Sequence, residues 1–134
     1  MGRLKILLVD DMPAMRMILK NMLEELGIKT VTEAEDGEMA WQLIRQSVTE
    51  EGLEPFDLVI ADWNMPGLSG VELLRAVRNL GQTRELPFFI MTAQAETRLI
   101  AEALHAGASD YVVKPFNREQ LGEKIHAVFP RHLL

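Results

Sequence analysis

Five polar residues stand directly after four short apolar runs, where their side chains could share one chemical task. Asp10 and Asp11 follow the run KILLV, Asp62 follows LVIA, Thr92 follows FFIM, and Lys114 follows YVV. If each run is a strand of one parallel sheet, these residues all lie at its carboxyl edge, where open α/β sheets bind their ligands. The spacing therefore predicts one small site that contains three carboxylates, a hydroxyl and an amine.

Three carboxylates packed together require a compensating positive charge, because like charges a few ångströms apart repel by several kcal/mol at an effective dielectric of about 20. Lys114 supplies one positive charge, and a donor set made only of oxygens favours a hard divalent cation, Mg²⁺ before Ca²⁺ or Mn²⁺. Because Mg²⁺ leaves room for phosphate oxygens, the pattern indicates phosphoryl chemistry. Asp62 stands alone at its strand end and is the expected nucleophile, with Lys114 and Thr92 binding the transferred oxygens.

Each of these residues also has a simpler structural explanation. An Asp before a helix commonly forms a turn or caps the helix, which would account for Asp10 or Asp11 taken singly. Thr92 could cap the following helix, and Lys114 with Pro115 could form a solvated turn. Only the coincidence of all of them at one edge of the sheet favours a shared site.

Short apolar runs alternate with longer segments of helical periodicity, which is typical of repeated βαβ units. The predicted strands are Lys5–Val9, Thr30–Ala34, Leu58–Ala61, Phe88–Met91 and Tyr111–Val113. Helices are predicted from Pro13 to Gly27, from Glu38 to Gln46, after a Ser69 cap through Val77, from Glu96 to His105, and around Leu121 to Phe129, ending at Pro130.

Right-handed crossovers with helices on both faces make a five-stranded parallel sheet the simplest arrangement of these elements. We predict an α/β fold with strand order 2-1-3-4-5, the doubly wound, flavodoxin-like arrangement that is common at this chain length. The strand order reverses between the first and third strands, and these two strands carry the three aspartates. The acidic segment Ser47–Asp57 is predicted to be a surface loop at the opposite edge of the sheet.

Composition and charge exclude several classes of protein. The 134 residues are expected to form a single domain, 1–134, without an effector domain. The absence of cysteine excludes disulfides, thiol nucleophiles and cysteine-ligated metals. With 14 basic and 20 acidic residues the net charge is −6, which disfavours nucleic-acid binding. No apolar run approaches the roughly 20 residues of a membrane span, so we expect a cytoplasmic protein with no membrane partner.

Four motifs together resemble the receiver domain of two-component response regulators. They are LLVDD from Leu7, DWNMP from Asp62 with Gly70 after it, MTA from Met91, and GASDYVVKPF from Gly107 to Phe116. The resemblance covers nearly the whole chain, and it is strongest to the single-domain receivers of bacterial chemotaxis. It implies the same doubly wound fold as the element pattern.

The resemblance also implies a role for each residue of the predicted site. Asp62 is the expected phosphoacceptor, and Asp11 and Asp62 are expected to bind Mg²⁺ through their side chains. Asn64 would bind the ion through its main-chain carbonyl, and Asp10 would act through water. Lys114 would contact the phosphoryl group, and the peptide bond between Lys114 and Pro115 is expected to be cis.

A second group of residues is implied to report phosphorylation to a partner. Thr92 is the expected switch hydroxyl, and Tyr111 is the aromatic side chain whose rotamer would follow it. Ile100, Tyr111 and Lys124 match positions of the partner surface, although Tyr111 on a short edge strand is equally well explained as a half-buried core residue. Many chemotaxis receivers carry Glu where this chain has Gln94, beside the path of the attacking water, which leaves the lifetime of the phosphoryl group open.

The resemblance implies a phosphoacceptor switch that assists its own phosphorylation and dephosphorylation, and not an enzyme. A histidine kinase would phosphorylate it, the flagellar motor switch protein would bind it, a phosphatase could reset it, and it would be a monomer. A phosphorelay intermediate or phosphate sink is the alternative within the same class. Outside that class, a phosphohydrolase would need a second acid where Asn64 stands, and an acidic site would repel the phosphate of a flavin cofactor.

Overall fold

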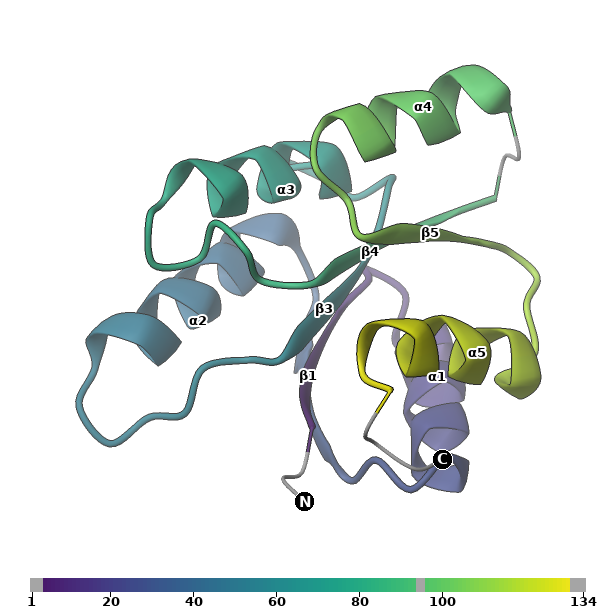
Figure 1. Cartoon of the computed structure of the whole chain (residues 1–134), viewed down its shortest axis with the longest axis horizontal. Coiled ribbons are helices and arrows are strands. Elements are labelled where there is room, and N and C mark those ends of the chain that lie inside the picture. Colours follow the sequence, from purple (N-terminus) through teal and green to yellow (C-terminus); the bar gives the residue numbers. More distant parts are fainter. Residues whose placement is uncertain (1–3, 94–95, 131–134) are drawn as a thin grey trace.

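The computed structural model describes residues 4–93 and 96–130, which form one parallel sheet of five strands with helices on both faces (Figure 1). The strand order is β2-β1-β3-β4-β5, and every neighbouring pair of strands is parallel. The predicted α/β fold and strand order are therefore confirmed.

The elements alternate strictly between strand and helix along the chain. The strands are β1 (Lys5–Val9), β2 (Thr30–Ala34), β3 (Leu58–Asp62), β4 (Phe88–Thr92) and β5 (Asp110–Val113). The helices are α1 (Pro13–Glu25), α2 (Gly37–Thr49), α3 (Gly70–Asn79), α4 (Thr97–His105) and α5 (Arg118–Val128).

Two buried layers lie on opposite faces of the sheet, because successive side chains of a strand point to opposite sides. Along β1, Ile6 and Leu8 belong to the layer under α1 and α5, whereas Leu7 and Val9 belong to the layer under α2, α3 and α4 (Figure 1). Each of these four side chains is fully buried. The continuous apolar runs of the sequence are thus explained by burial on both faces.

Three strands differ by one residue from the prediction. β3 includes Asp62 and β4 includes Thr92, since the ladder continues through the pairing of Asp62 with Met91 and of Thr92 with Val113. β5 begins one residue earlier, at Asp110. The two polar side chains at the carboxyl edge are therefore held by regular sheet and not by the loops that follow.

The loop predicted at Ser47–Asp57 begins later in the structure, because α2 continues to Thr49. Ser47 is buried and its hydroxyl donates to the carbonyl of Ile44, while the Thr49 hydroxyl donates to that of Arg45. These bonds keep polar residues within the helix, where sequence alone favours a turn. The remaining segment, 50–57, leads into the amino end of β3, so its predicted place away from the carboxyl edge is confirmed.

The residues at the N-cap positions of three helices can now be compared with the caps that the sequence suggested. Ser69 caps α3, as predicted, and the structure adds a reciprocal pair of bonds with Glu72. α1 has Met12 at its N-cap position and α4 has Glu96, neither with a side-chain capping bond. The N-cap positions of these helices are therefore not occupied by the aspartates before α1 or by the threonine before α4.

Within the described ranges of the chain, no helix has the length and apolar character that a membrane span requires.

Candidate functional site

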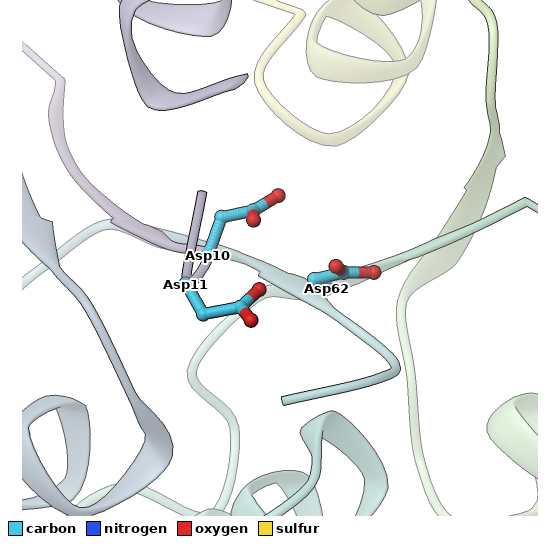
Figure 2. Close-up of side chains that lie close together, drawn as sticks. All are labelled: Asp10, Asp11 and Asp62. Carbon is cyan, nitrogen blue, oxygen red and sulfur yellow. The ribbon is translucent and has the colours of Figure 1, made fainter. Parts of the chain in front are cut away.

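The three aspartates meet at the carboxyl edge of the sheet, where β1 and β3 run side by side. Val9 pairs with Ala61, so Asp10 and Asp11 emerge from β1 beside Asp62 at the end of β3. One carboxylate oxygen from each residue lies within 4.8 Å of the others. Figure 2 shows Asp10 and Asp11 extending from the end of β1 toward the space beside Asp62. The three carboxylates therefore lie together, as the spacing of the sequence predicted.

Asp10 combines the two roles that the sequence offered for it. Its side chain is fully buried, and its Oδ1 accepts a hydrogen bond of 2.9 Å from the main-chain N–H of Met12. This bond shapes the turn into α1, while Oδ2 lies 3.5 Å from Nζ of Lys114. Asp11, by contrast, is exposed, so its carboxylate is open to a ligand from solvent.

Asp62 is only 8% exposed, and its carboxyl group has a pKa above its usual value. Burial is the main cause, since a charge is costly away from water, and the neighbouring Asp10 carboxylate raises the pKa further. Lys114 and the main-chain N–H of Asn64 act in the opposite direction. The negative charge on Asp62 is therefore only partly compensated by the protein itself.

Lys114 reaches the site from the far end of the chain. Its Nζ lies 3.3 Å from Oδ2 of Asp62 and 3.5 Å from Oδ2 of Asp10, so one ammonium bridges two carboxylates. Its main-chain N–H donates a 2.7 Å bond to the carbonyl of Thr92, which fixes β5 against β4 at this edge. The peptide bond between Lys114 and Pro115 is cis, as the resemblance implied.

The segment after Asp62 turns away from the sheet under tight steric control. Trp63 donates a 2.8 Å bond to the carbonyl of Met91 and accepts one of 3.0 Å from the N–H of Gly70. A Cβ atom on Gly70 would overlap the carbonyl oxygen of Asp62, so only glycine permits this return of the chain. Asn64, the expected carbonyl ligand, is exposed between these anchors.

The expected switch residues lie on the β4, β5 and α5 side of the site. Thr92 is 5% exposed at the end of β4, next to β5, on which Tyr111 is half-buried. Lys124 of α5 holds its Nζ 4.8 Å from the centre of the Tyr111 ring and 3.2 Å from Oδ1 of Asp110. Ile100 is half-buried on α4, which packs beside β5, and Gln94 lies outside the described residues.

Sequence reasoning did not single out Glu38, which contacts the segment after Asp62. Its carboxylate accepts from the N–H of Leu68, with Oε1 at 3.2 Å and Oε2 at 3.0 Å. The partners are 30 residues apart. The one sequence signal was a glycine beside each partner, Gly37 before Glu38 and Gly67 before Leu68.

The donor set fits a hard divalent cation. Among the described residues, three carboxylates face one ammonium, which leaves two negative charges uncompensated, and the metal-binding groups gathered here are all oxygens. The carboxylates of Asp10, Asp11 and Asp62 lie close enough together to hold Mg²⁺, while the roles expected of the Asn64 carbonyl and of a water at Asp10 stay predictions. A bound Mg²⁺ would supply positive charge to phosphate oxygens at this edge.

Residues 6–126 match the family model of the response regulator receiver domain. The chain belongs to this family. It is 44% identical over 128 residues to the chemotaxis protein CheY of Pseudomonas aeruginosa, an alignment that covers 96% of this chain and 98% of that protein. The resemblance seen in the motifs is therefore confirmed across the receiver domain.

Solved receiver domains share the fold over nearly its full length. The chemotaxis response regulator CheY4 of Vibrio cholerae aligns with a TM-score of 0.83 and 31% identity, covering 95% of this chain and 99% of that one. A sensor histidine kinase receiver domain from Pseudomonas aeruginosa aligns with a TM-score of 0.77 and 30% identity, covering 94% of this chain and 97% of that one. That structure contains a magnesium ion coordinated in its active site cleft.

Proposed function

We propose that this receiver domain is a chemotaxis response regulator that accepts a phosphoryl group on Asp62 from a histidine kinase, with Mg²⁺ bound, and then binds the flagellar motor switch protein. The observation that carries the proposal is the meeting of three carboxylates with Lys114, whose Nζ lies 3.3 Å from Oδ2 of Asp62. The 44% identity to a chemotaxis protein over nearly the whole chain supports the chemotaxis assignment.

The reaction is a transfer between two nucleophiles. A carboxylate oxygen of Asp62 attacks the phosphorus of a phosphohistidine, and a phosphorus–oxygen bond forms as the phosphorus–nitrogen bond breaks. The electron pair stays on the imidazole nitrogen, which takes a proton from solvent. Burial raises the pKa of Asp62, and a more basic carboxylate is a better nucleophile. Lys114 lies close enough to pair with the charge that gathers on the phosphoryl oxygens.

Phosphorylation then changes the charge balance around Thr92 and Lys114. The phosphoryl group carries about −1.5 to −2 charges and offers strong acceptor oxygens. The Thr92 hydroxyl and the Lys114 ammonium would move toward it to form charge-assisted hydrogen bonds. Space vacated behind Thr92 would admit Tyr111, which is half-buried on the neighbouring strand.

The partner surface on this interpretation is made by α4, β5 and α5. Tyr111 and Lys124 line a hollow of about 290 Å³ on this side of the molecule, and Ile100 lies on the adjacent helix. An inward rotation of Tyr111 would remove its ring from beneath the Lys124 ammonium and reshape the hollow. A motor switch peptide would bind the reshaped surface more tightly than the resting one.

The first test is phosphorylation by acetyl phosphate with Mg²⁺, followed by intact-mass spectrometry. The wild-type chain is expected to gain the mass of one phosphoryl group, and Asp62→Asn is expected to gain none. Asp57→Asn is the matched control, because Asp57 accepts a bond from the N–H of Lys5 at the opposite edge of the sheet and the amide keeps an acceptor oxygen. Labelling of Asp62→Asn, or loss of labelling in Asp57→Asn, would contradict the assignment.

The second test measures the partner. Fluorescence polarisation of a labelled motor switch peptide should show tighter binding to the phosphorylated chain, and Lys124→Ala should weaken that binding without reducing phosphorylation. Equal affinity for both forms would overturn the motor assignment. Onward transfer of the phosphoryl group to a histidine phosphotransfer domain would instead identify a phosphorelay intermediate.

A further inference from the structure

The segment 63–69, between β3 and α3, carries Asn64 and follows Asp62 directly. Its first residue, Trp63, is anchored by main-chain bonds to Met91 of β4 and to Gly70, the first residue of α3. In its middle, Met65 is buried in the core, whereas Asn64, Pro66 and Gly67 are exposed. The exposed main chain needs a further anchor if the carbonyl of Asn64 is to hold one orientation.

That anchor comes from the first turn of α2. Both oxygens of the Glu38 carboxylate lie within hydrogen-bond distance of the Leu68 N–H, at 3.2 Å and 3.0 Å. A carboxylate that accepts from a main-chain N–H makes a charge-assisted bond, which is stronger than a neutral one. The bond joins α2 to a segment that no other described hydrogen bond connects to this helix.

Two glycines permit the close approach of these elements. A Cβ atom on Gly37 would overlap the carbonyl oxygen of Leu68, and a Cβ atom on Gly67 would overlap the carboxylate of Glu38. Gly67 also has a φ of 73°, in the left-handed region that other residues avoid. Each partner of the bond between Glu38 and Leu68 is therefore preceded by a glycine, and the absence of a side chain at these two positions lets α2 and segment 63–69 approach each other.

We propose that Glu38 is a positioning residue for Mg²⁺ binding, which holds segment 63–69 so that the Asn64 carbonyl is oriented toward the site. Glu38 touches neither the ion nor the phosphoryl group in this role. The inference rests on the proposed function, because it assumes that the Asn64 carbonyl is a ligand. Groups that orient metal ligands typically change metal affinity by about 10- to 100-fold when they are lost. For an exposed bond we expect the lower end of that range.

The test is a Mg²⁺ titration followed by the fluorescence of Trp63, in a Trp41→Phe background that leaves one tryptophan. Glu38→Asp keeps the charge but loses the reach to Leu68, whereas Glu38→Gln loses the charge but keeps an acceptor oxygen at the same distance. Positioning predicts a dissociation constant raised about tenfold in Glu38→Asp and within about twofold of wild type in Glu38→Gln. An effect of charge alone predicts the reverse order and would overturn the inference.

Glu35→Gln is the matched control, because Glu35 is exposed just after β2 at the same edge of the sheet and makes no bond to segment 63–69 among the described contacts. It should bind Mg²⁺ as wild type does. At saturating Mg²⁺, Glu38→Asp should be phosphorylated by acetyl phosphate at the wild-type rate, since only ion binding is weakened. A rate that stays low at saturation would show a general structural defect and overturn the inference.

The amide of Leu68 supplies a readout that does not depend on the ion. Its proton should move upfield and exchange faster in Glu38→Asp than in wild type, because the carboxylate acceptor is lost. Unchanged Mg²⁺ affinity together with this altered amide would overturn the inference and leave the proposed function intact. Failure of the wild-type chain to bind Mg²⁺ would overturn the proposed function itself.

Discussion

Replacement of Asp62 by asparagine should stabilise the fold in the absence of Mg²⁺, although it removes the expected phosphoacceptor. Burial and the Asp10 carboxylate raise the pKa of Asp62 in the folded state. A carboxyl group whose pKa is raised by folding destabilises the folded state at pH values above that pKa, where it is ionised. The asparagine side chain has nearly the same size and carries no charge, so the variant is free of that penalty.

The magnitude follows from distances in the site. At an effective dielectric of about 40, between that of water and that of a buried site, the repulsion between Asp62 and Asp10 at the 4.8 Å limit is about 1.7 kcal/mol, and the attraction of Lys114 at 3.3 Å is about 2.5 kcal/mol. Desolvation of the buried carboxylate is the largest contribution, at about 3 kcal/mol. The ionised carboxylate therefore costs about 2 kcal/mol, and Asp62→Asn should raise Tm by about 7 °C.

Thermal unfolding by circular dichroism, in EDTA and in Mg²⁺, checks both the sign and its cause. The advantage of Asp62→Asn in EDTA should shrink as the pH falls through the raised pKa, because protonation removes the charge from the wild-type chain. Mg²⁺ at 100 times the wild-type dissociation constant should stabilise the wild-type chain by about 2.7 kcal/mol, but a variant with tenfold weaker binding by only about 1.4 kcal/mol. A lower Tm for Asp62→Asn than for wild type in EDTA would refute the reasoning.

Three further changes test other parts of the structure. Asp11→Ala should raise the Mg²⁺ dissociation constant at least about tenfold in a fluorescence titration, since it removes an exposed charged ligand; unchanged binding would exclude it as a ligand. Gly70→Ala should lower the free energy of unfolding by about 1–3 kcal/mol in urea, because its Cβ would overlap a carbonyl oxygen. Arg78→Met should cost about 2–3 kcal/mol in the same assay and leave acetyl phosphate labelling unchanged, because its half-buried guanidinium donates to two main-chain carbonyls far from the site.

Much of the fold could be predicted from the chain because its signals are local. Apolar runs such as Lys5–Val9 and the reciprocal capping pair of Ser69 and Glu72 depend on neighbours in the sequence. Local signals failed at the end of α2, where the hydroxyls of Ser47 and Thr49 bond to helix carbonyls. Polar residues next to glycine and proline favour a loop until their hydrogen bonds are known.

The candidate site could be predicted as a meeting of strand ends, but its contacts could not. That Asp10 and Asp62 lie together follows from the strand order, since the carboxyl ends of neighbouring parallel strands share one edge. The bond between Glu38 and Leu68 depends on how closely α2 approaches segment 63–69, which two separated glycines permit. The periodicity of apolar residues in the sequence does not indicate how closely a helix approaches a loop, so this contact could not be predicted.

The amino-acid sequence by itself determined the order of strands and helices, the oxygen-only donor set and the residues that end each strand. Tertiary structure decided the electrostatics, because it brought Lys114 to within 3.5 Å of a carboxylate 104 residues away and buried Asp62 beside Asp10. Charge interactions and desolvation depend on distance and on exclusion of water, and both are properties of the folded chain. The residue types determine which chemical groups are available, whereas packing determines how easily each of these groups ionises.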